Sequence, residues 1–157
     1  MVGTLAKWLR ILGYDTCFDP DMDDHQLVRL ARAEDRVLLT RDRELARRPG
    51  LNAVFVTSES LDAQIGQVLT ELSLEPDRSF SRCSVCNEQL AEVDREAVRE
   101  RVPAYVAQTQ ELFRACPACQ RVYWRGTHWQ QMDEQLARIL KGEIPSETDE
   151  MPNPKTR

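Results

Sequence analysis

The chain has 157 residues, of which 41% are hydrophobic and 30% charged, and its formal net charge at pH 7 is −5. This composition is typical of a globular protein and argues against a mainly disordered chain. Proteins that coat nucleic acid non-specifically are usually basic, so the acidic balance disfavours that class. It remains compatible with an enzyme that contacts nucleic acid through a local basic patch and holds metal ions with carboxylates.

In chain order, the first half of the sequence alternates predicted helices and strands. Apolar residues at helical spacing predict helices over 4–12, after the acidic loop 19–24 and over 61–72, with a short helix starting near residue 41. Short apolar runs predict strands at 16–18, 37–40 and 53–57. Continuous apolar strands that alternate with helices are typical of a parallel sheet buried on both faces, so the predicted fold class is α/β.

Two Cys-x-x-Cys motifs, separated by residues 87–115, are the strongest signal in the second half. Four thiolates in two such motifs can close a tetrahedral zinc site, and this spacing fits a zinc ribbon. The alternative is two disulfides or four buried thiols, but disulfides belong to oxidising compartments and the N-terminus lacks the apolar segment of a signal peptide. We therefore expect a cytoplasmic protein with a structural Zn²⁺ held by Cys83, Cys86, Cys116 and Cys119.

The region after the second motif predicts a ribbon strand at 122–124 and a last amphipathic helix. Tyr123 and Trp124 can stack on bases, but on a ribbon strand we expect them to pack the small core. From residue 142 the chain is rich in Pro, Glu, Ser and Thr, which is typical of a disordered tail. The expected division is a lobe over 1–76, the zinc ribbon with its terminal helix over 77–141, and the tail over 142–157.

Acidic residues are candidates for chemistry in the first lobe. Asp42 follows the strand 37–40, and active sites of parallel sheets form at the carboxyl ends of the strands. Asp24 stands at the start of a helix that should open toward the same edge. Carboxylates there can bind Mg²⁺ or Mn²⁺, which can generate hydroxide and stabilise a phosphoryl transition state. The sequence is equally compatible with Asp24 as a helix N-cap, a role that Asp23 can also take, and with Asp42 as a turn residue.

Arginines flank the second of these carboxylates. Arg41 and Arg43 lie on either side of Asp42, and further arginines follow at positions 47 and 48. These side chains can contact the phosphates of RNA. On charge counting alone, a solvated surface is the more frequent role of such a cluster.

Four segments, taken in order, resemble one known family. Residues 3–16 resemble its opening helix, residues 24–31 and 36–42 resemble its two internal acidic motifs, and residues 116–128 resemble its ribbon signature. The family is the Mut-seven C-terminal ribonuclease domain, a PIN-like lobe fused to a zinc ribbon, and the resemblance covers roughly residues 1–141. It implies a three-layer α/β/α lobe and a metal-dependent ribonuclease in which Asp24 and Asp42 bind the catalytic Mg²⁺ or Mn²⁺.

The start of the chain departs from that family. Members usually begin with a short apolar strand that ends in an acidic residue, and Met1 falls where this strand should already have ended. Either the true start lies upstream, which we favour because a missing central strand would expose the edges of its neighbours, or the protein lacks the strand. We expect the 157-residue chain to be a poor nuclease, and an upstream strand with an acidic residue to restore metal-dependent cleavage.

Two classes of function follow. The first is a divalent-metal endoribonuclease in which the ribbon grips RNA or stabilises the lobe. The second is a non-catalytic adaptor for RNA or protein, built on a degenerate PIN-like lobe and a structural zinc ribbon. A zinc hydrolase is disfavoured, because four cysteine ligands leave no open position on the ion.

Overall fold

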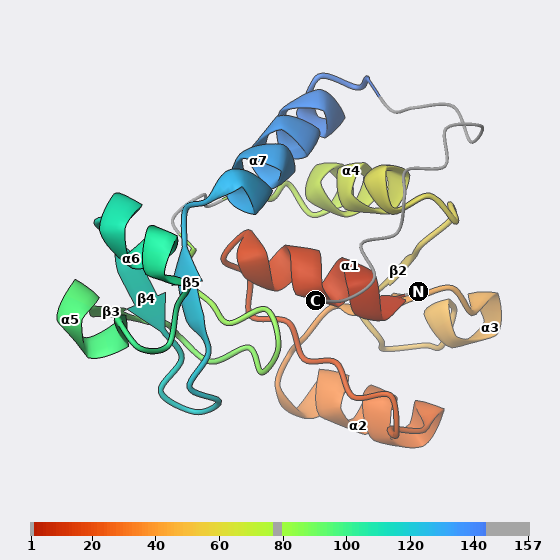
Figure 1. Cartoon of the computed structure of the whole chain (residues 1–157). Helices are drawn as coiled ribbons and strands as arrows, with labels where there is room; N and C mark the ends of the chain where they lie inside the picture. Colours follow the sequence, from red (N-terminus) through yellow and green to blue (C-terminus); the bar gives the residue numbers. More distant parts are fainter. Residues whose placement is uncertain (1, 77–79, 144–157) are drawn as a thin grey trace.

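The computed structural model describes residues 2–76 and 80–143, which form two small sheets and the helices around them (Figure 1). The predicted disordered tail lies outside the described residues from position 144 onward. The elements of the described residues are α1 (Val2–Ile11), α2 (Asp24–Ala33), β1 (Leu38–Thr40), α3 (Arg43–Ala46), β2 (Ala53–Phe55), α4 (Leu61–Glu71), β3 (Ala91–Val93), α5 (Arg95–Val98), α6 (Ala104–Thr109), β4 (Phe113–Ala115), β5 (Val122–Trp124) and α7 (Thr127–Leu140).

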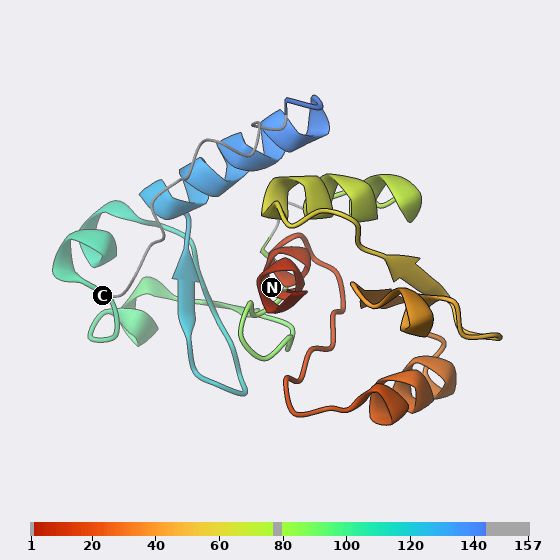
Figure 2. The same cartoon turned by 90° about the vertical axis from the view of Figure 1, so that its right-hand side faces the viewer.

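The first sheet is parallel and is covered on both faces. β1 pairs with β2, with Leu39 opposite Val54. Successive side chains of a strand point to opposite faces. Leu38 accordingly packs in the cluster formed by α2 and α3, whereas Leu39 packs against the cluster formed by α1 and α4. Figure 2 shows the strands between α4 and α2, so the predicted mixed α/β class with a parallel sheet is confirmed.

The strand predicted at 16–18 is wrong, because the structure has no strand there. The backbone N–H of Thr16 donates to the side-chain oxygen of Asn87 at 3.0 Å instead of joining a sheet. Thr16 therefore lies beside the first Cys-x-x-Cys motif, since Asn87 follows Cys86 directly. A run of three residues in the sequence does not show whether its backbone pairs in a sheet or contacts the side chain of a distant residue.

The second sheet is antiparallel and has the strand order β3-β4-β5. Phe113 lies opposite both Val93 and Trp124, and these three residues face a small core supplied by α5 and α6. The expected packing of Trp124 is therefore observed. Tyr123 occupies the next position on β5, so its side chain leaves on the other face of the sheet.

The last helix returns to the first lobe. Met132, Leu136 and Ile139 of α7 are buried in one cluster with residues of α1 and α4, such as Trp8 and Ile65. Helix α7 follows the ribbon in sequence but contributes to the largest core of the described residues. The chain therefore crosses from the lobe to the ribbon and back.

Candidate functional site

The four cysteine sulfurs converge on one point between the two Cys-x-x-Cys motifs. The Sγ atoms of Cys83, Cys86, Cys116 and Cys119 all lie within 4.8 Å of one another, and all four residues are free thiols. The Sγ atoms of Cys86 and Cys116 are 3.3 Å apart, far longer than a disulfide bond. A zinc ion with Zn–S bonds of about 2.3 Å requires sulfur separations of roughly 3.8 Å. The predicted four-cysteine group therefore fits a tetrahedral zinc ion.

Each pair of cysteines is presented by a backbone turn, and the two turns are of the same type. The N–H of Asn87 donates to the carbonyl of Cys83 at 3.0 Å, and the N–H of Gln120 donates to the carbonyl of Cys116 at 2.9 Å. Asn87 and Gln120 are both left-handed, with φ of 69° and 63°. This conformation is unfavourable for most residues and is tolerated best by glycine and asparagine. The two motifs are therefore equivalent knuckles whose turns direct their sulfurs inward.

The electrostatics of the cluster favour a bound cation. Burial opposes ionisation of Cys83, but hydrogen bonds from the Tyr123 hydroxyl and from two backbone N–H groups outweigh it and lower the pKa of this thiol to about 6. Although a backbone N–H favours the Cys86 thiolate, burial and the neighbouring thiols raise its pKa to about 12. The Cys83 thiol therefore ionises easily, whereas the neighbouring Cys86 thiol resists ionisation. A divalent cation at the centre removes this conflict, because it stabilises all four thiolates together.

Tyr123 is a residue of the metal site that the sequence argument assigned to packing. Its hydroxyl lies 3.0 Å from Cys83 Sγ and 3.3 Å from Ser84 Oγ. Burial and the contact with Cys83 raise the pKa of Tyr123 to about 12, so the hydroxyl keeps its proton and can donate it to the sulfur. Side chains alternate between the two faces of a strand, so the sequence of β5 already indicated that Tyr123 faces away from Val122 and Trp124 and is free for this role.

The candidate catalytic carboxylates line a different part of the molecule. A hollow of about 690 Å³ lies beside β1, with walls from α1, α2 and the segment between them. Both Asp24 and Asp42 line this hollow. They approach it from the start of α2 and from the carboxyl end of β1. The two residues therefore face a shared space rather than opposite sides of the lobe.

The hollow does not contain a closed carboxylate cluster among the described residues. Within residues 2–76 and 80–143, the four cysteines are the only group of three or more His, Cys, Asp or Glu ligand atoms within 4.8 Å of one another. A divalent ion held by Asp24 and Asp42 would therefore complete its coordination with water or with oxygens of a bound substrate. Mg²⁺ commonly keeps several waters in this way.

Helix capping distinguishes the two carboxylates. The N-cap of α2 is Asp23, which accepts the N–H of Gln26 at 2.9 Å in a capping box, so Asp24 is exposed in the first turn and does not serve as the cap. Asp42 caps α3, because its Oδ1 accepts the N–H of Leu45 at 3.0 Å. Asp24 is therefore not engaged in helix capping, whereas Asp42 is held in a fixed orientation by α3.

The arginines beside Asp42 already have partners within the protein. Arg41 Nη2 lies 3.1 Å from a carboxylate oxygen of Glu59. The guanidinium of Arg43 stacks 5.1 Å from the centre of the Phe55 ring. Both side chains remain exposed at the carboxyl end of the sheet. They can reach a phosphate only by sharing or exchanging these contacts.

Comparison with protein families gives a match over most of the chain. A family model described as the Mut7-C RNAse domain matches residues 1–136. No curated protein and no solved structure matches the chain. Within the part of the chain that the structure describes, no helix is long and apolar enough to cross a membrane.

Proposed function

Because the chain belongs to the Mut7-C RNAse domain family, we propose that it is a metal-dependent ribonuclease whose PIN-like lobe cleaves RNA at the hollow beside β1. In this proposal Asp24 and Asp42 hold Mg²⁺ or Mn²⁺, and the four cysteines hold a structural Zn²⁺. The observation that supports it is that Asp24 and Asp42 line one hollow beside β1, and that Asp42 directly follows the carboxyl end of this strand, the usual place for chemistry in a parallel sheet. A role for Zn²⁺ in hydrolysis is disfavoured, since four thiolates leave no open position.

The proposed roles of the residues follow from their positions. Asp42 would present the carboxylate oxygen that does not accept the N–H of Leu45, so its orientation is fixed before the ion binds. Asp24 would supply the second oxygen from the first turn of α2. Arg41 and Arg43 would orient the phosphodiester. The divalent ion, when bound, would make a coordinated water a better nucleophile and would neutralise charge on the phosphate during hydrolysis.

The test is cleavage of a 5′-labelled single-stranded RNA with Mn²⁺ under single-turnover conditions, which detect even the slow cleavage expected of this chain. Asp42→Asn keeps an oxygen that can cap α3 but removes the negative charge, so it separates capping from metal binding. We expect Asp42→Asn and Asp24→Asn each to reduce cleavage about 100-fold or more while zinc content stays unchanged, because each removes a charged ligand worth several kcal/mol. Asp21→Asn is the matched control, since Asp21 lies in the same acidic loop but does not line the hollow.

A second candidate function is a non-catalytic adaptor that binds RNA or protein. It is favoured because, among the described residues, no third carboxylate converges with Asp24 and Asp42 into a three-ligand group, although Asp19 lines the same hollow. The adaptor predicts no metal-dependent cleavage by the wild-type protein and no change on substitution of either aspartate. In both cases, thiolate ligands must stay reduced, so the proposed location is a reducing compartment such as the cytoplasm.

A further inference from the structure

Arg10 of α1 is the only charged side chain that is buried among the described residues, with 5% of its surface exposed. Its Nε donates to the carbonyl of Thr16 at 2.8 Å. Its Nη1 donates to the carbonyls of Ser84 and Val85, at 3.2 Å and 2.8 Å. Ser84 and Val85 are the two residues between the cysteines of the first knuckle. A helix of the lobe therefore holds the backbone of the metal-binding motif directly.

The charge of this arginine has no carboxylate partner in the described contacts. A buried charge is costly unless it is hydrogen-bonded and balanced. The three carbonyl groups provide the hydrogen bonds but no net negative charge. Four thiolates around one divalent cation carry a net charge of −2, and the knuckle that Arg10 grips supplies two of them. The metal-loaded site would therefore supply negative charge that complements the guanidinium, since the Asp15 carboxylate beside Thr16 is already paired with Arg36.

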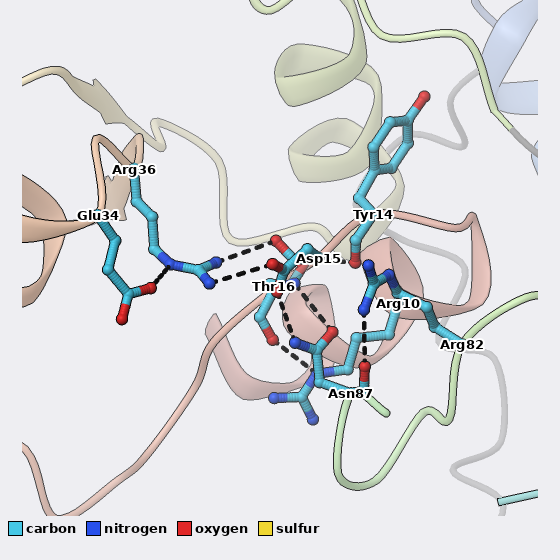
Figure 3. Close-up of polar contacts among 8 residues, drawn as sticks. All are labelled: Arg10, Tyr14, Asp15, Thr16, Glu34, Arg36, Arg82 and Asn87. Carbon is cyan, nitrogen blue, oxygen red and sulfur yellow. Dashed lines mark hydrogen bonds and ion pairs between the residues drawn. The ribbon is translucent and has the colours of Figure 1, made fainter. Parts of the chain in front are cut away.

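A second contact joins the same knuckle to the lobe (Figure 3). The side-chain oxygen of Asn87 accepts the N–H of Thr16 at 3.0 Å, and its amide donates to Asp15 at 2.6 Å. Arg36 donates to the other carboxylate oxygen of Asp15 at 3.1 Å. Asn87 follows Cys86 directly, so these contacts fix the end of the turn whose start is held by Arg10.

The second knuckle has a different kind of support. The side-chain amide of Gln120 donates to the carbonyl of Pro117 within the same turn, at 2.9 Å. Arg101, from the segment between α5 and α6, donates to the carbonyl of Gln120. These contacts lie within the ribbon. The two knuckles thus have equivalent turns but differ in the part of the chain that holds them.

We propose that Arg10 is a positioning residue of the four-cysteine metal site, which holds the first knuckle in its metal-binding form and balances the charge of the thiolates, with Asn87 as its partner. The metal site is then shared between the lobe and the ribbon. Outer contacts of this kind typically change metal affinity by about 10- to 100-fold. This inference requires zinc at the cysteines but does not depend on ribonuclease activity.

The first test measures the rate of zinc release from the purified full chain to an excess of chelator. We expect Arg10→Met to release zinc about tenfold faster than the wild-type protein, with Arg10→Lys between the two. The sulfur-to-metal charge-transfer band of the Co²⁺-loaded protein should also shift in Arg10→Met, because the charge near the thiolates has changed. Arg29→Met is the control, since Arg29 is exposed on α2. A wild-type release rate and an unchanged band in folded Arg10→Met would overturn the proposal.

A second pair of variants tests the proposal even if Arg10→Met does not fold. Asn87→Gly and Gln120→Gly remove equivalent side chains at left-handed positions that glycine adopts without strain. Only the first variant loses contacts with the lobe. We therefore expect faster zinc release from Asn87→Gly than from Gln120→Gly. Equal rates, or a wild-type protein that binds no zinc at the cysteines, would contradict the role proposed for Arg10 and Asn87.

Discussion

Asp24 and Asp42 line the same hollow, although one begins a helix and the other follows a strand. Both residues line this hollow because of how α2 and β1 are arranged in space, since the chain runs along the full length of both elements between Asp24 and Asp42. This relationship supports the proposed catalytic metal site. It is also open to direct measurement without an RNA substrate.

The first prediction concerns binding of Mn²⁺. We expect the wild-type protein, with zinc at its cysteines, to bind one Mn²⁺ and the variants Asp24→Asn and Asp42→Asn to bind it at least about tenfold more weakly, because each loses a charged oxygen ligand. Electron paramagnetic resonance of free Mn²⁺ measures this binding, with Asp21→Asn as the control. Equal affinity in all four proteins would mean that the hollow is not the site of the ion.

The second prediction separates helix capping from metal binding at Asp42. Asp42→Ala removes the acceptor of the Leu45 N–H, whereas Asp42→Asn can retain it. We expect Asp42→Ala to lower the free energy of unfolding by about 1 kcal/mol, the usual value of an N-cap, and Asp42→Asn to lower it by less. Urea unfolding without Mn²⁺ measures both values. If the two variants are equally destabilised, the cap makes no measurable contribution to stability.

The third prediction concerns removal of zinc. The ribbon has a small core around Val98, Val106 and Phe113, and zinc binding of about 10–16 kcal/mol can dominate the folding of such a module. We expect a chelator, or Cys116→Ser, to remove hydrogen-exchange protection from β3, β4 and β5. The amides of β1 and β2 should keep more of their protection, since their pairing does not involve the cysteines. Full protection of the ribbon sheet in zinc-free protein would show that the metal is dispensable for folding.

The fourth prediction tests the return of α7 to the lobe. Leu136 is 2% exposed and packs in the largest core, whereas Leu140 on the same helix is 49% exposed. Leu136→Ala should lower the free energy of unfolding by about 2–5 kcal/mol through lost burial and a cavity. Leu140→Ala should change it by less than about 0.5 kcal/mol. Thermal or urea unfolding checks both, and similar losses in the two variants would contradict the packing of α7.

The fifth prediction concerns pH. Hydrogen bonds from Arg36 and then from Asn87 hold the pKa of Asp15 below its usual value of 3.8. A carboxyl with a lowered pKa in the folded state stabilises the fold above its unfolded pKa, and this contribution is lost as the pH falls through the folded value. The stability difference between wild type and Asp15→Asn should therefore be constant from about pH 5 to 7 and shrink below 3.8.

Unfolding of both proteins at a series of pH values measures this difference. Zinc content is measured at each pH in both proteins, because Asp15 contacts Asn87 of the first knuckle and its substitution can also change zinc retention. Arg36→Gln should reduce the same difference at neutral pH, because it removes the strongest partner of Asp15. A difference that grows as the pH falls would show that the sign of the effect is wrong.

The sequence predicted those features that depend on local spacing. A Cys-x-x-Cys turn brings its two sulfurs together within a few residues, so the four ligands could be identified without coordinates. Helical spacing and buried apolar runs likewise predicted the helices of the lobe and the strands β1 and β2. Within each motif, helix or strand, the side chains that must act together are near neighbours in the chain.

Contacts between distant segments could be decided only by the tertiary structure. Thr16 is not in a strand because Asn87 takes its N–H, and the buried Arg10 reaches Ser84 and Val85 in the other half of the chain. The shared hollow of Asp24 and Asp42 has the same origin. Local patterns set which face of an element is apolar, but they do not specify which distant segment covers it, because that choice depends on how all the faces pack together.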